Sequence, residues 1–291
     1  MTAPGNKIIS PPQRATLGGA AAICAVIALL SFIMVMPHRI GFWTVATVAI
    51  LALCAVVSRS GQAVHLSLFA LLWIALPFTV SVFRPWPFGL LIPIAAYGIL
   101  VAAVPPLRRS FGWLRRGRWG ADVLRLVLAT VVVSGVALVV WYGAVLPDVR
   151  QSLKYLPHMP IWIFPLAGLG FAMRNAALEE AIFRGIIMDA LDSAFGPGNT
   201  AIALQAASFA LLHYVSGFPS GGWGLAMTFV YGRMLGTIRR CSQGMLAPLL
   251  EAGAVSEESF EDILAELDGW QASDGDFYAL SRQVQVSGER P

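Results

Sequence analysis

Long apolar runs, each close to the length of a membrane span, recur along the chain with little sequence between them. A helix that crosses the hydrocarbon core of a bilayer needs about 20 mostly apolar residues. Unpaired backbone groups are costly in lipid, and the runs lack the alternation of barrel strands, so we predict an all-α fold, a polytopic transmembrane helical bundle of about eight spans. The candidate spans are residues 17–36, 40–57, 63–82, 88–104, 123–146, 161–177, 200–215 and 223–238.

Composition supports a bilayer as the natural solvent of this chain. Hydrophobic residues make up 57% of it and charged residues only 12%, whereas a soluble domain carries about 25% charged residues. The first run is followed by Pro37, His38 and Arg39 rather than by a small-residue cleavage site, so we predict an uncleaved first span. The three cysteines lie in or beside apolar segments without paired metal-ligand spacing, and we predict that they are packing residues: Cys24, Cys54 and Cys241.

A basic loop at residues 105–120 sets the expected orientation. It contains five arginines: Arg108, Arg109, Arg115, Arg116 and Arg118. The positive-inside rule places such a loop in the cytoplasm, and because four spans precede it, the N-terminus is expected there too. We interpret the loop as a contact with anionic lipid, and we expect no nucleic-acid partner because no nucleic-acid motif accompanies it. We therefore predict a multi-pass protein of a bacterial plasma membrane.

The charge of the chain reverses near Glu251. Residues 1–250 hold 18 basic and 6 acidic side chains, whereas residues 251–291 hold 2 basic and 10 acidic ones. The apolar positions of this last segment are spaced through acidic ones, as in an amphipathic helix, and the segment is too polar to span a membrane. We therefore predict a transmembrane bundle at 1–250 and an acidic soluble tail at 251–291 that is available to a soluble partner.

Charged and polar side chains concentrate in and after the sixth apolar run, where each central charge costs about 3 kcal/mol. Glu180 and Arg184 are four residues apart on one helix, so they can pair across a turn. Glu179 is then left on a neighbouring face, where an apolar cavity disfavours its charged form and suits it to act as a general base. The full set is Arg174, Asn175, Glu179, Glu180, Arg184 and Asp189.

The next apolar run carries one histidine, His213, four residues after Phe209 and on the same helical face. An imidazole there can ligate a metal or move a proton. Two plainer interpretations stay open: a lone histidine in a membrane helix is often a hydrogen-bonded packing residue, and Glu180 with Arg184 can serve only to fix helix register. Neither of these explains Glu179.

These residues resemble a known family. The stretch LEEAIFRG at 178–185, followed by FALLH at 209–213, is similar to the first two motifs of the CAAX protease and bacteriocin-processing (CPBP) intramembrane metalloproteases, of the CAAX prenyl protease 2 type. The likeness continues through GWGL at 222–225, GRMLG at 232–236 and GMLAPLL at 244–250, so it covers roughly residues 160–250.

The resemblance implies an endopeptidase that hydrolyses peptide bonds within or beside the membrane, in a membrane-delivered peptide or protein. Glu179 and His213 match the residues that activate water, on a divalent metal for which zinc is the expected ion and these two residues the expected ligands. Glu180 and Arg184 match the second glutamate and the arginine of the family motif, where a charge pair holds the geometry of the site. The expected catalytic set is thus Glu179, Glu180, Arg184 and His213.

The chain departs from the family after residue 250. The family continues with His-x-x-x-Asn or His-x-x-x-Asp, but Ala252 and Ser256 stand at those positions. Glu251 precedes the expected histidine by one residue, which turns it by about 100° around a helix. Hydrolytic zinc sites normally use three protein ligands, so a second hypothesis is an inactive membrane scaffold that presents the acidic tail to a partner. A proton-coupled transporter lacks support because the sequence has no inverted repeat.

Overall fold

The computed structural model describes residues 14–33, 41–85, 87–114, 117–147, 160, 162–216 and 219–244. Every regular element within these ranges is helical, as the apolar runs predict. The acidic tail, with Ala252 and Ser256, lies outside the described residues, as do Arg115 and Arg116 of the basic loop. The helices are α1 (Leu17–Phe32), α2 (Gly41–Val57), α3 (Gly61–Thr79), η3 (Ser81–Phe83), α4 (Phe88–Ala103), α5 (Pro105–Ser110), α6 (Ala121–Val145), α8 (Phe164–Glu180), η4 (Ala181–Ile187), α9 (Met188–Phe195), α10 (Asn199–Ser216) and α11 (Gly221–Ser242).

Each of the eight apolar runs overlaps with one of the longer helices, and the differences lie at the helix ends and in the connections. The basic loop begins with the short helix α5, which the sequence reasoning missed. Proline is well suited to the first turn of a helix because its missing N–H would have no partner there, and Pro105 and Pro106 occupy that turn.

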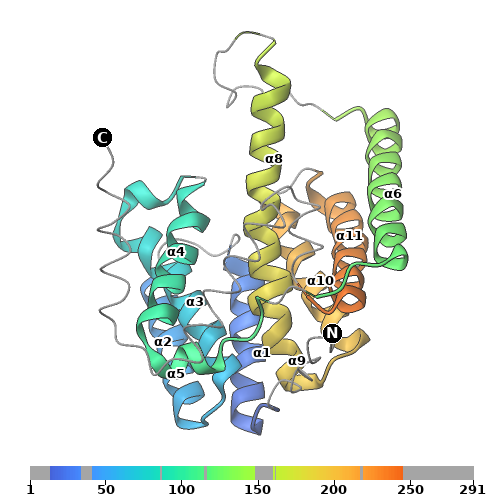
Figure 1. The fold of residues 1–291 in the computed structure, drawn as a ribbon. Coiled ribbons are helices and arrows are strands. Elements are labelled where there is room, and N and C mark those ends of the chain that lie inside the picture. The colour runs from blue at the N-terminus through green and yellow to red at the C-terminus, as the bar shows by residue number, and fades with distance from the viewer. Residues whose placement is uncertain are drawn as a thin grey trace, which may run out of the picture.

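A single helical rod carries the LEEAIFRG stretch at residues 178–185, which is called the charged motif below. The sixth apolar run and the charged stretch after it form one continuous helix, because the structure continues from α8 through η4 into α9 without a break. The middle piece, η4, is a π-helix of 7 residues. Such segments are rare and occur frequently at functional sites. In Figure 1, α8 rises out of the body of the molecule, so its lower end and η4 lie among the other helices.

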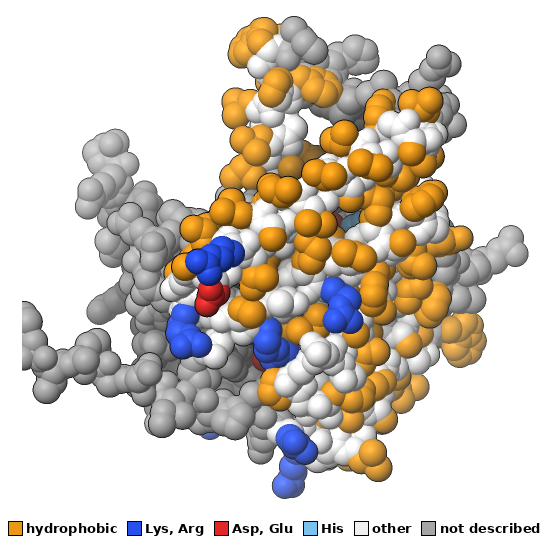
Figure 2. Space-filling view, turned by 90° about the vertical axis from the view of Figure 1, so that its right-hand side faces the viewer, with side chains coloured by type: hydrophobic (Ala, Val, Ile, Leu, Met, Phe, Trp, Pro, Cys, Tyr) orange, Lys and Arg blue, Asp and Glu red, His pale blue; other side chains and the backbone are white. Residues whose placement is uncertain are grey.

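Two of the described helices, α3 and α6, are long and apolar enough to cross a membrane by length and composition, while α1, α2 and α4 are apolar but shorter. The eight-span arrangement and its orientation remain predictions. Helix α6 stands beside α11 at the edge of the molecule (Figure 1). Only 11% of its most apolar stretch of 18 residues is buried inside the molecule. Figure 2 shows apolar side chains spread over this face of the molecule, with the basic ones gathered toward one end. Exposed apolar patches of this extent are characteristic of surfaces that meet lipid or another protein.

The main apolar core joins the first half of the chain to the motif-bearing helices. It includes Ile23 of α1, Leu66 and Phe69 of α3, Ile186 of η4 and Phe209 of α10, all 2% exposed or less. The helices preceding the basic loop therefore form one packed body with η4 and α10.

Helices α10 and α11 pack closely because α11 presents glycines to α10. A Cβ atom at Gly232 would lie 3.2 Å from Cβ of Ala206, and one at Gly236 would lie 3.0 Å from Cγ2 of Ile202. Small residues four apart allow helix backbones to approach in this way. The close contact fixes α10, and with it the position of His213, against α11.

The prediction that the cysteines are packing residues is wrong. Cys24, Cys54 and Cys241 are all exposed free thiols. Helices α1 and α2 carry apolar residues on every side, so residue type does not indicate which side of the helix packs. The thiols lie on the outer faces.

Candidate active site

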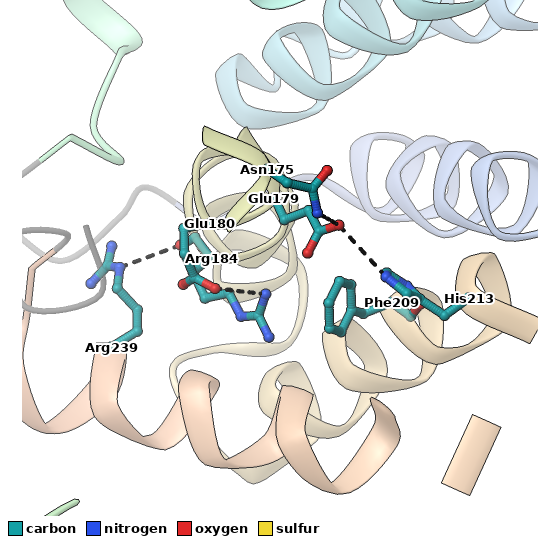
Figure 3. A network of polar contacts seen from close by, with 7 residues as sticks. All are labelled: Asn175, Glu179, Glu180, Arg184, Phe209, His213 and Arg239. Carbon is teal, nitrogen blue, oxygen red and sulfur yellow. Dashed lines mark hydrogen bonds and ion pairs between the residues drawn. The ribbon is translucent and has the colours of Figure 1, made fainter. Parts of the chain in front are cut away.

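Two adjacent glutamates at the end of α8 point to different partners (Figure 3). Oε1 of Glu180 lies 2.9 Å from Nη1 of Arg184, and this ion pair is almost fully buried, with exposed fractions of 5% and 0%. The guanidinium of Arg184 also lies over the ring of Phe209, 4.5 Å from its centroid. The pairing predicted from the i, i+4 spacing is therefore present, although whether it serves catalysis remains a prediction.

Glu179 faces α10 instead. Its Oε1 lies 3.6 Å from Nε2 of His213, and the two side chains keep exposed fractions of 19% and 24%. This separation is longer than a hydrogen bond, so the two groups face each other across a small gap. The structure thus brings together the two residues that the sequence singled out for water activation.

The ring of His213 is held by its other nitrogen. Nδ1 lies 2.9 Å from the carbonyl oxygen of Phe209. A carbonyl can only accept a hydrogen bond, so Nδ1 carries the hydrogen and donates it. In the neutral imidazole, Nε2 then presents its lone pair toward Glu179, which is the state that can bind a metal or accept a proton.

Asn175 is a site residue whose role the sequence reasoning missed. Its Nδ2 donates a hydrogen bond of 2.8 Å to Oε1 of Glu179 (Figure 3). The residue lies four positions before Glu179 on α8, so the same i, i+4 argument that paired Glu180 with Arg184 could have found it. The amide fixes the direction in which the Glu179 carboxylate points.

Phe209 connects the two pairs of polar residues. Its ring centroid lies 4.3 Å from that of His213 and 4.7 Å from that of Phe183, and the Arg184 guanidinium lies over the same ring. The ring thus lies between the His213 imidazole and the Arg184 guanidinium, so it separates the buried ion pair from the partly exposed Glu179 and His213.

Two arginines near the end of α11 fasten that helix to the motif-bearing rod. Nε of Arg239 donates to the carbonyl oxygen of Arg184 over 3.3 Å. Both terminal nitrogens of Arg240 bind the carboxylate of Asp192, at 2.9 and 2.6 Å. Helical spacing could not have indicated these contacts, because the partners lie about 50 residues away along the chain.

Glu179 and His213 fit two positions of a zinc site by ligand type and spacing. Ligands held at about 2.1 Å by a tetrahedral ion lie about 3.4 Å apart, close to the 3.6 Å between Oε1 and Nε2. In the part of the chain that the structure describes, no group of three or more His, Cys, Asp and Glu side chains could hold a metal ion. The other histidine that the structure describes, His65 of α3, forms hydrogen bonds with Tyr97 of α4 and Ser110 of α5.

Comparison with known proteins shows what the second half of this chain resembles. Residues 160–251 match the model of the family described as type II CAAX prenyl endopeptidase Rce1-like. The match spans the charged motif, His213 and the helix that holds Arg239 and Arg240. No curated protein and no solved structure matches the chain.

Proposed function

Because residues 160–251 of this chain match the model of the Rce1-like family of type II CAAX prenyl endopeptidases, we propose that the protein hydrolyses peptide bonds with water activated by Glu179. The observation that carries the proposal is the Glu179 carboxylate facing the Nε2 atom of His213, 3.6 Å away, at a site that keeps partial access to the outside. Glu180 and Arg184 support the site by fixing the helix from which Glu179 projects.

The proposed chemistry is hydrolysis by a water molecule that Glu179 activates. Glu179 takes a proton from a water molecule, and the water oxygen attacks the carbonyl carbon of the scissile bond. When the carbon–nitrogen bond breaks, the proton held by Glu179 passes to the leaving amine nitrogen. Asn175 keeps the carboxylate aimed at the reacting water, and the carbonyl of Phe209 keeps Nε2 of His213 turned toward the same place.

A divalent metal is part of the proposal, with Glu179 and His213 as its protein ligands on this chain. Zinc fits an imidazole nitrogen and a carboxylate oxygen, and when bound it would polarise the water and the substrate carbonyl. Metal analysis of the purified protein tests this: zinc that is present in wild type and lost in His213→Ala is expected, whereas equal metal content in the two proteins contradicts it.

We further propose a multi-pass arrangement in the membrane, with the basic loop and the N-terminus in the cytoplasm. The exposed apolar surface of α6 supports lipid contact, and the arginines of the loop support its cytoplasmic position. The substrate class that fits is a peptide brought to the site by the membrane, such as a prenylated C-terminal peptide.

A second candidate is a pseudoprotease, that is, a membrane scaffold that keeps the fold without the activity. One feature favours it: Ala252 and Ser256 occupy the positions at which the related proteases are expected to carry a histidine and an amide or acid. In that case the acidic tail would present a binding surface to a soluble partner.

Cleavage assays separate the two candidates. The full-length protein in lipid nanodiscs is offered a prenylated peptide, and wild type is compared with Glu179→Ala and His213→Ala. A matched control is Asp122→Asn, because Asp122 is an exposed acid on α6 that pairs with the exposed Arg125. The proposal expects cleavage by wild type and the control and a loss in both site variants. No cleavage by any of the four proteins favours the scaffold, and equal cleavage by all four contradicts the proposed site.

A further inference from the structure

The basic loop, which lies outside the family match, reaches the centre of the charged motif through one aromatic side chain. A Cβ atom placed on Gly185 would lie 2.5 Å from Cε3 of Trp113 and 2.9 Å from its Cδ2 and Cζ3 atoms. The indole of Trp113 therefore rests directly on the backbone of Gly185, in space that any other residue would fill. The glycine of the LEEAIFRG stretch is accounted for by this contact.

Gly185 lies within η4, the π-helical segment that begins directly after Glu180. The preceding carbonyl, that of Arg184, accepts the hydrogen bond from Arg239 of α11. The segment is thus held on two sides, by an indole from the basic loop and by a guanidinium from α11. The i→i+5 hydrogen bonds of a π-helix are rarer than those of the flanking α-helices, so contacts from outside the segment help to determine its geometry.

The loop that carries Trp113 is itself anchored to the first half of the chain. Ser110 Oγ lies 3.0 Å from Nε2 of His65, and the backbone carbonyl of Ser110 accepts a hydrogen bond of 3.2 Å from Gln62. The hydroxyl of Tyr97 lies 2.9 Å from Nδ1 of the same histidine. Helices α3 and α4 therefore hold the end of α5 in place, three residues before Trp113.

We propose that Trp113 is a positioning residue of the active site: its indole, anchored through Ser110 and His65, sets the backbone of η4 and thereby the direction of the Glu179 carboxylate. The inference rests on the proposed function, and it assigns to the helices outside the family match a direct part in the geometry of catalysis. Glu179 lies two residues before η4, so a shift of that segment moves the carboxylate relative to His213.

The expected consequence is a loss of turnover with little change in substrate binding. A displacement of about 1 Å in a catalytic group can reduce the rate about 100-fold. Trp113 contacts the backbone of η4 and not the space between the Glu179 carboxylate and the His213 imidazole. Removal of the indole should therefore lower kcat and leave KM close to that of wild type.

A double-mutant cycle tests the contact. Kinetic constants for cleavage of the prenylated peptide are measured for Trp113→Ala, Gly185→Ala and the double variant, in the full-length protein in nanodiscs. Gly185→Ala should lower kcat about 100-fold because the new methyl group collides with the indole. Trp113→Ala should lower kcat about tenfold, and the double variant should regain the level of Trp113→Ala because the collision is gone.

Two controls match these variants. Gly170→Ala adds a methyl group to α8 where nothing lies within 4 Å, and Trp119→Ala removes an exposed indole of the same loop. Both should keep the kcat of wild type. If Gly185→Ala does not fold, Trp113→Phe decides, because a smaller ring should give a kcat between those of wild type and Trp113→Ala.

The outcomes distinguish the inference from the function on which it rests. Additive effects of the two substitutions, a raised KM with unchanged kcat, or equal kcat for wild type, Trp113→Phe and Trp113→Ala overturn the positioning role in an active enzyme. Absence of cleavage by wild type, or unchanged cleavage by Glu179→Ala, overturns the proposed function and the positioning role with it.

Discussion

At the scale of single residues, Glu180 and Glu179 are neighbours in sequence with different surroundings, and they should respond differently to substitution. Glu180 is buried against a fully buried Arg184. Replacing Glu180 with Ala leaves an uncompensated buried charge, which costs about 3–5 kcal/mol of stability. The unfolding temperature in detergent should therefore be clearly lower for Glu180→Ala than for wild type. The double variant Glu180→Ala/Arg184→Met should recover most of the loss, and no recovery would contradict the buried pair.

The amide of Asn175 gives a second prediction at this scale. It orients the Glu179 carboxylate through one hydrogen bond of 2.8 Å. Asn175→Ala should lower kcat about tenfold, while the free energy of unfolding changes by only about 1 kcal/mol, the usual net contribution of such a bond. Asn175→Gln has the same amide on a longer side chain and should restore part of the rate. Wild-type kcat in Asn175→Ala would show that Glu179 needs no such support.

The residues also show what sequence reasoning could reach. The Glu180 and Arg184 pair follows from helical spacing alone, and Asn175 could have been found by the same spacing. The approach of Glu179 to His213 depends on how α8 and α10 pack, so only the family resemblance indicated it beforehand. The contact of Trp113 with Gly185 joins distant parts of the chain, and local patterns carry no information about it.

At the scale of helices, the close packing of α10 on α11 predicts that added volume at the contact destabilises the protein. A methyl group at Gly236 would lie 3.0 Å from the Ile202 side chain, so Gly236→Ala should destabilise the protein by about 1–3 kcal/mol through overpacking. Gly143→Ala on α6 meets nothing within 4 Å and should cause no loss, because alanine favours the helix more than glycine does. Thermal unfolding of both variants tests this. A stabilising Gly236→Ala would contradict the close contact.

Helix type and approximate position followed from the apolar runs, whereas irregular features did not. The π-helical turn at Ala181–Ile187 has no periodicity signal, because the residues on both sides of it continue one apolar helix. Helix α5 was missed because its Pro-Pro start resembles a loop in sequence. Both features lie next to the site, where tertiary contacts determine the local backbone more than propensity does.

At the scale of the whole molecule, the exposed apolar surface predicts which thiols water can reach. Cys24 lies on an outer face in the middle of α1, whereas Cys241 lies near the end of α11 beside Arg240. In native membranes, a charged maleimide should label a variant that retains only Cys241 and should leave one that retains only Cys24 unlabelled, since thiolate formation needs water. After denaturation, both should react. Equal labelling in the membrane would contradict lipid contact at α1.

The central claim is that the Glu179 carboxylate activates the water that cleaves the peptide bond. The most direct measurement is the single-turnover rate of cleavage of a prenylated peptide by wild type and by Glu179→Gln, an isosteric change without the basic carboxylate. We predict a fall of about 100-fold or more, the usual contribution of a general base, with an unchanged unfolding temperature. Cleavage by Glu179→Gln within about twofold of the wild-type rate would contradict the account.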